Sequence, residues 1–296
     1  MLQIIRYRNW YFGFSLLLVI LSLFAIFGYG IKEGIDFAGG SIMSVRMEDE
    51  VQAETVRIFL EKDLKREDIT VVQDLTNKVY TLRTAELSEA DHKKILTDLS
   101  AKFGKVEEVR YESFGPAVGE ELRTNSFIAF FLVLFVISLY VSFAFRKATG
   151  KVSVFTYAFV TILTLFHDVI IPLGLLAYLG HTRGVEVGVT IVVAILAIIG
   201  FSVHDTIVVI DRTRENLHRM SGKSFSEIVN TSLNETLARS INTSLTLIFT
   251  LLALVFFGPA SLFYFSLTIL VGVFFGTYSS IFLASSLLTI MEKRRL

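Results

Sequence analysis

Two aspartates stand in long stretches of the chain that otherwise lack charge. Between residues 152 and 180, His167 and Asp168 are the only charged or histidine side chains, and between residues 187 and 210 they are His204 and Asp205. Arg239 directly precedes residues 240–291, which carry no charge. At the centre of a bilayer a charge costs at least about 2.5–3.5 kcal/mol, so it needs a specific role there. Carboxyl, imidazole and guanidinium groups in one apolar environment could bind and release a proton.

The apolar stretches are long enough to cross a membrane. Of the 296 residues, 53% are hydrophobic and only 19% are charged, unlike a soluble domain. A spanning helix needs about 20 mostly apolar residues, and the turn signal Gly258-Pro259 divides the longest run. The first run is longer than the core of a signal peptide, so we expect an anchor. The predicted spans are residues 10–31, 125–145, 153–179, 188–210, 240–257 and 262–290.

Basic residues are distributed asymmetrically between the loops, which predicts the orientation. They gather at the N-terminus (Arg6, Arg8), after the second span (Arg146, Lys147, Lys151), after the fourth span (Arg212, Arg214, Arg219, Lys223) and at the C-terminus (Lys293, Arg294, Arg295). We therefore expect both termini to be cytoplasmic. The predicted organisation is an N-terminus and first helix at 1–31, an extracytoplasmic domain at 32–122, and helices two to six with their cytoplasmic loops at 123–296.

Residues 32–122 have the pattern of a small α+β domain. Alternation predicts strands at 41–48, 68–74, 78–84 and 106–113, and helical spacing predicts helices at 51–64 and 88–103. Ser88 is a plausible N-cap, and Leu75-Thr76-Asn77 is expected to join two strands. The order β-α-β-β-α-β is that of ferredoxin-like domains. Acidic residues outnumber basic ones here, which does not suit nucleic acid.

Asp205 and Arg239 are expected to lie at similar depths in the membrane. At 1.5 Å per residue, Asp205 lies roughly 9–10 Å from the charged segment that begins at Asp211, and an arginine at the start of the fifth span could reach a similar depth. An arginine partner favours the charged carboxylate and apolar surroundings favour the acid, so making and breaking the pair would move a proton. The alternative is a polar cluster that only fixes helix packing. We expect residues 211–239 to form one or two short amphipathic helices at the inner surface.

Some chemistries are excluded or disfavoured. The chain has no cysteine, which excludes disulfides and thiolate metal sites. It has neither an HExxH motif nor a P-loop, so we expect no metal, no cofactor and no enzyme activity. Two intramembrane aspartates could suggest an intramembrane protease, but Asp205 follows Ser-Val-His rather than Gly-x-Gly.

Four motifs resemble those of the SecF family. Gly34-Ile-Asp36-Phe-Ala-Gly39-Gly40 is similar to its G-I-D-F-x-G-G signature. The fourth-span segment, which contains His204, Asp205, Asp211, Arg212, Arg214, Glu215 and Asn216, is similar to S-x-N-D-T-x-V-x-x-D-R-x-R-E-N. Arg239-Ser-Ile-Asn242-Thr243-Ser244 is similar to R-x-I-x-T-S, and His167-Asp168 matches an H-D pair. The main departure is His204, where asparagine is common.

The resemblance implies an α-helical polytopic membrane protein with one ferredoxin-like domain, half of a resistance-nodulation-division unit. It implies a protein translocase subunit of the bacterial inner membrane that pairs with SecD, works beside the SecYEG translocon, and uses the proton-motive force late in export. Further partners would be the exported unfolded polypeptide and a small accessory membrane subunit. The implied proton pathway contains Asp205, Arg239, Asp168, His204 and His167. A small-molecule exporter half and a scaffold for SecD remain alternatives.

Overall fold

A computed structural model describes residues 1–48, 51–64, 69–74, 78–144, 153–220 and 222–293. The chain divides into two compact units. A helical unit contains Met1–Lys32 and Ile128–Leu296, and a smaller unit contains Glu33–Phe127. The predicted connection at residues 75–77 lies outside the described residues, as do several of the basic loop residues used for the orientation.

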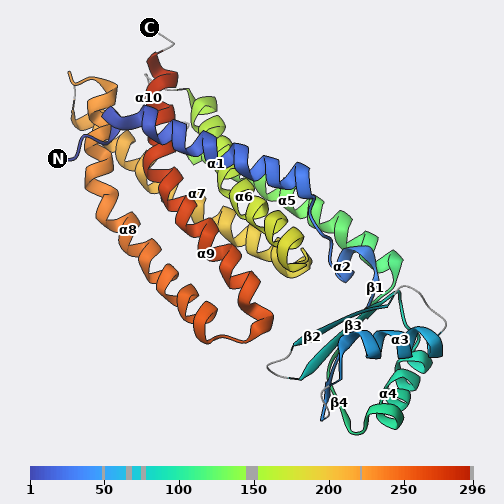
Figure 1. The fold of residues 1–296 in the computed structure, drawn as a ribbon. Helices are drawn as coiled ribbons and strands as arrows, with labels where there is room; N and C mark the ends of the chain where they lie inside the picture. Colours follow the sequence, from blue (N-terminus) through green and yellow to red (C-terminus); the bar gives the residue numbers. More distant parts are fainter. Residues whose placement is uncertain (49–50, 65–68, 75–77, 145–152, 221, 294–296) are drawn as a thin grey trace. The chain divides into compact units, whose positions relative to one another are not determined.

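The helical unit is built from six long apolar helices (Figure 1). They are α1 (Arg8–Tyr29), α5 (Pro116–Ala144), α6 (Val154–Arg183), α7 (Val189–Arg219), α8 (Phe225–Phe257) and α9 (Phe263–Tyr278), the last continued by a π-helical segment (Ser279–Ala284) and α10 (Ser285–Lys293). Each is long and apolar enough to span a membrane. The six-span prediction is confirmed, and Gly258 ends α8 as expected.

The prediction of one or two short amphipathic helices at residues 211–239 is wrong. Instead, α7 continues to Arg219 and α8 already begins at Phe225. The charged end of α7 stays helical because Glu215 pairs with Arg212 and Arg219, three and four residues away. A capping box formed by Ser224 and Glu227 starts α8. The membrane helices therefore extend beyond their apolar parts, and a short turn joins them.

The smaller unit is a four-stranded antiparallel sheet with two main helices. Its elements are α2 (Ile35–Ala38), β1 (Gly40–Met47), α3 (Ala53–Leu64), β2 (Thr70–Asp74), β3 (Val79–Thr84), α4 (Glu89–Phe103) and β4 (Val106–Phe114). The strand order β2-β3-β1-β4 confirms the ferredoxin-like topology. Val56 and Leu60 of α3 and Ile95 and Leu99 of α4 pack in one core with the sheet. Ser88 caps α4 as predicted, accepting from the Asp91 backbone.

The paired glycines before β1 have a structural function. Gly39 and Gly40 have φ values of 74° and 125°, which favour glycine. A Cβ on Gly40 would lie 2.8 Å from the Thr84 carbonyl oxygen in the neighbouring strand. Gly34 and Asp36 belong to the short helical turn that precedes this pair. The motif is thus the tight entry into β1.

Candidate functional site

Asp168 lies at the centre of a buried polar cluster in the helical unit. Its side chain, on α6, is fully buried. Oδ2 accepts hydrogen bonds from the hydroxyls of Ser202 on α7 and Ser279 on the π-helical segment, the latter at 2.8 Å. Oδ1 lies 2.8 Å from Nδ1 of His167, which is also buried. Three donor groups from three elements therefore hold this carboxyl group.

The π-helical segment supplies two polar side chains of the last span, Ser279 and Ser280. A π-helix adds a residue to the turn and is frequent at functional sites. Here it points Ser279 at Asp168 and brings the Ser280 hydroxyl to 2.8 Å from that of Thr206 on α7. Ser280 also donates to the backbone carbonyl of Ser202. The segment thus connects α6 to two successive turns of α7.

Asp205 is buried but held by fewer contacts. Its residue is 2% exposed, and Oδ2 accepts one long hydrogen bond, 3.3 Å, from the Ser244 hydroxyl of α8. That hydroxyl also lies 2.8 Å from the Ser240 carbonyl oxygen, so a single proton is shared between two acceptors. Thr277 donates to the Ser244 oxygen at 2.6 Å. A chain of two hydroxyls therefore leads from the last span to Asp205.

The predicted ion pair between Asp205 and Arg239 is not present in the structure. Arg239 is exposed on α8 and lines an open cavity of about 630 Å³ with Asp211 and Glu235. The reason is helical phase: five residues separate Arg239 from Ser244, which turns their side chains about 140° apart around α8. Because Ser244 faces Asp205, Arg239 faces elsewhere. The depth of a residue along its helix, on which the prediction was based, does not give the direction in which its side chain points.

The remaining predicted residues on α7 and α8 also differ in whether their side chains contact a buried carboxylate. His204 is exposed on α7, although it adjoins the buried Asp205. Asn242 is exposed on α8, and Thr243 donates back to the Arg239 carbonyl oxygen at 2.8 Å. In the R-x-I-x-T-S segment, Ser244 alone has a hydrogen bond to a buried carboxylate among the contacts of the described residues.

The charged motif at the end of α7 forms a clamp onto α8. Arg212 donates through Nε to Glu235 of α8 at 2.7 Å, and it pairs with Glu215, three residues further along α7. Asn216 donates to Glu235 at 2.6 Å and to the Ser232 hydroxyl at 3.0 Å. Arg214 lies 3.7 Å from Asp211. The clamp, in which Arg212 and Asn216 of α7 contact Glu235 and Ser232 of α8, fixes the two helices together, whereas the other pairs lie within α7.

Sequence reasoning missed the partners of the carboxylates. Ser202 and Ser279, which hold Asp168, and Glu235, which closes the clamp, were not predicted. A signal existed for some of them: Ser279-Ser280 and Ser285-Ser286 are polar pairs in an apolar span, and polar side chains there tend to face other helices.

These features define a class of protein: a six-span membrane protein with a ferredoxin-like domain after the first span and carboxylates buried among its helices. The comparisons specify the family. The protein-family model described as "Protein export membrane protein SecD/SecF, C-terminal" matches residues 94–294, and the family model described as "SecD/SecF GG Motif" matches residues 24–51. The chain belongs to the SecF family of protein translocase subunits, which confirms the resemblance and assigns the chain to protein export.

Similar proteins cover nearly the full length of the chain. Protein translocase subunit SecF of Thermobaculum terrenum is 41% identical, over 99% of this chain and 95% of its own. SecF of Sebaldella termitidis is 36% identical, over 99% and 92%. The crystal structure of SecDF from Thermus thermophilus matches with a TM-score of 0.83 at 35% identity, and this chain covers 38% of that longer chain.

Proposed function

We propose that this chain works with SecD in the bacterial cytoplasmic membrane and couples the proton-motive force to late steps of Sec-dependent export beside the SecYEG translocon. Its termini face the cytoplasm, and residues 32–122 lie outside with the emerging polypeptide. The names of the relatives support this proposal, because SecF relatives are called translocase subunits and the Thermus relative is a single SecDF chain. The basic loops support the orientation.

The observation that carries proton coupling is the incomplete satisfaction of Asp205. A buried carboxylate with one shared hydrogen bond is costly when charged, so protonation and a change of partner are coupled. We propose that Asp205 accepts the proton, and that a helix movement brings Arg239 toward it to favour release. A potential of 100 mV supplies about 2.3 kcal/mol per charge moved across the membrane, enough to bias such a two-state movement.

A stripe on α7 and α8 fits a surface for SecD. Gly200 and His204 are exposed four residues apart on α7, and Asn242 and Thr246 are exposed four apart on α8. The two helices pack against each other. Polar groups are disfavoured against lipid, whereas small and polar residues are typical of helix interfaces in membranes. A second membrane helix, rather than lipid, is the environment that this stripe suits.

One cavity of the smaller unit bears on the alternative of a small-molecule exporter. A cavity inside the smaller unit, lined by Met43, Leu60, Leu82 and neighbouring residues, holds only about 10 Å³. Pockets for drug-sized ligands usually hold about 300–1,000 Å³. This cavity could not accept such a substrate.

Export of a slow-folding secreted reporter tests the proposal. Cells depleted of their own SecF would express this chain with its SecD, either unchanged or as Asp205→Asn, and export would be measured with and without an ionophore. We predict that Asp205→Asn assembles with SecD but loses the ionophore-sensitive part of export. Parental export by the assembled variant would contradict the proposal and leave the polar cluster with a packing role.

A further inference from the structure

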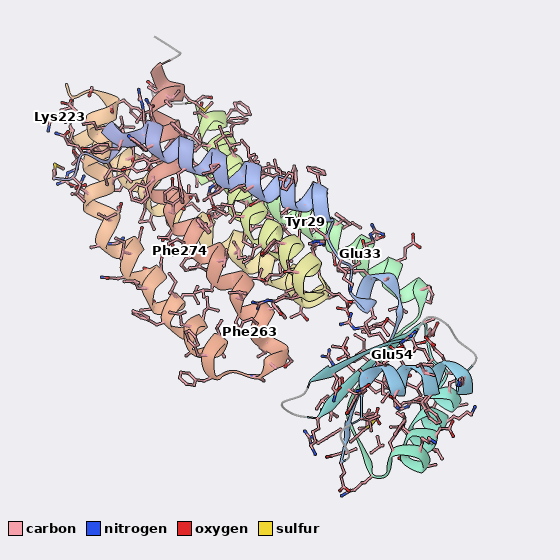
Figure 2. All side chains as sticks on the ribbon, in the orientation of Figure 1. Tyr29, Glu33, Glu54, Lys223, Phe263 and Phe274 are labelled. Carbon is pink, nitrogen blue, oxygen red and sulfur yellow. The ribbon has the colours of Figure 1, made fainter. Side chains whose placement is uncertain are left out.

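A second site, distant from the buried carboxylates, lies where the chain begins. An open cavity of about 840 Å³ lies between the N-terminal segment, the start of α8 and the end of α10. Its lining includes three basic residues, Arg6, Arg8 and Lys223. Figure 1 shows the N-terminus, α10 and the start of α8 at one end of the helical unit, and Figure 2 labels Lys223 there.

The N-terminal segment is fixed in place, so the cavity has a built wall. The backbone of Leu2 donates to Asn234 at 2.8 Å and accepts from Asn230 and Asn234, each at 2.9 Å. Ile4 and Ile5 are buried in the core of the helical unit. The short 3₁₀ helix at Ile4–Tyr7 thereby holds Arg6 over the cavity.

The basic side chains at the cavity have few competing partners. Arg6 donates to Gln3 at 3.1 Å, and Arg6, Arg8 and Lys223 form no ion pair with a carboxylate in the part of the chain that the structure describes. Glu227 and Glu292 also line the cavity. Glu227 is engaged by the backbone and hydroxyl of Ser224 in the capping box. Glu227 also interacts electrostatically with Lys223. The cavity therefore presents three cationic side chains and two carboxylates.

Two aromatic residues that neighbour the arginines of the cavity in the sequence indicate the depth of this part of the chain. Tyr7, between the two arginines, is 54% exposed, and Trp10, two residues after Arg8, is 78% exposed. Exposed tryptophan and tyrosine at the end of an apolar helix are typical of the headgroup level of a membrane. Basic pockets between helices at this level suit anionic phospholipid headgroups.

We propose that this cavity binds the phosphodiester headgroup of an anionic phospholipid, held by Arg6, Arg8 and Lys223. The lipid's acyl chains would lie along the exposed apolar surface of α1, beside Trp10. Occupancy would hold the N-terminal segment against α8. The proposal does not depend on proton coupling, since none of these residues contacts Asp168 or Asp205.

Trp10, the only tryptophan in the chain, lies two residues after Arg8 and reports on lipid next to the site. The full chain would be reconstituted in phosphatidylcholine with a small fraction of lipid brominated on its acyl chains, either phosphatidylglycerol or phosphatidylcholine. We expect brominated phosphatidylglycerol to quench Trp10 more strongly. Arg6→Gln with Arg8→Gln removes that preference, and Lys223→Gln weakens it about fivefold, as expected from about 1 kcal/mol per basic residue. Arg219→Gln, at the same end but outside the cavity, is the matched control and retains it.

Three results would overturn the proposal. Equal quenching by the two brominated lipids in the unchanged chain would show that no anionic lipid is enriched at Trp10. Loss of the preference in Arg219→Gln to the same extent as in Lys223→Gln would show general surface attraction. Inorganic phosphate is then added against chloride of equal ionic strength. Retained quenching supports a lipid, whereas displacement by phosphate alone would reassign the site to a free anion.

Discussion

Asp168 and Asp205 are two carboxyl groups in one helical unit, and their surroundings differ. Asp168 receives donors from His167, Ser202 and Ser279 and has no exposure to solvent or lipid. Asp205 shares one long hydrogen bond from Ser244 and lies next to an exposed face of α7. A fully satisfied buried group fixes structure, whereas a partly satisfied one changes partners easily. Our proposal therefore assigns the proton to Asp205 because it has fewer donors than Asp168, and not because it is buried.

The largest difference is expected in stability. Asp168→Ala leaves buried donors on His167 and Ser202 without an acceptor, at about 1–3 kcal/mol each, whereas Asp205→Ala removes one shared bond. We predict that Asp168→Ala lowers the Tm of the chain in detergent by several degrees and that Asp205→Ala changes it little. Thermal unfolding followed by circular dichroism would measure both. Equal Tm losses would refute the contrast.

Two glycines near these aspartates differ in the space around them, as the aspartates differ in their contacts. A Cβ on Gly276 would lie 3.3 Å from the Ser202 Cβ and 3.6 Å from Asp168, whereas Gly200 has no heavy atom of the described residues within 4 Å. Gly276→Leu should therefore destabilise the isolated chain by about 1–3 kcal/mol through overpacking. Gly200→Leu should leave its Tm nearly unchanged but reduce co-purification with SecD. Unchanged co-purification would exclude this part of α7 from the interface.

The smallest expected effect is on the pKa of Glu54, a carboxylate that does have an arginine partner. Glu54 is exposed in the smaller unit and accepts from Arg57 at 2.5 and 2.9 Å. The Arg57 hydrogen bonds lower the pKa of Glu54 below its ordinary value. The resulting stabilisation is present above the unfolded-state pKa and is lost as pH falls through the folded pKa. Carboxyl-carbon NMR of labelled protein should show a lowered pKa that Arg57→Gln returns toward normal; an unchanged pKa would refute the pairing.

The sequence predicted the spans, the ferredoxin-like order and the cap at Ser88, because hydrophobic runs, alternation and capping are local signals. It also selected Asp168 and Asp205, since charge is rare in apolar helices. It did not predict what each carboxylate contacts. Rise per residue gives depth, but rotation about α8 placed Ser244 rather than Arg239 at Asp205. In the last span, the π-helical segment changes the direction in which Ser279 points, and no local signal in the sequence specifies a π-helix.

Infrared difference spectroscopy of the reconstituted SecD complex tests the central claim most directly. The protonated-carboxyl stretch would be followed as pH is changed, in the unchanged chain, in Asp205→Asn and in Asp168→Asn. We predict one band that titrates in the unchanged chain, persists in Asp168→Asn and disappears in Asp205→Asn. A titrating band that disappears only in Asp168→Asn would show that the well-satisfied carboxyl group carries the proton, and would contradict the assignment of Asp205.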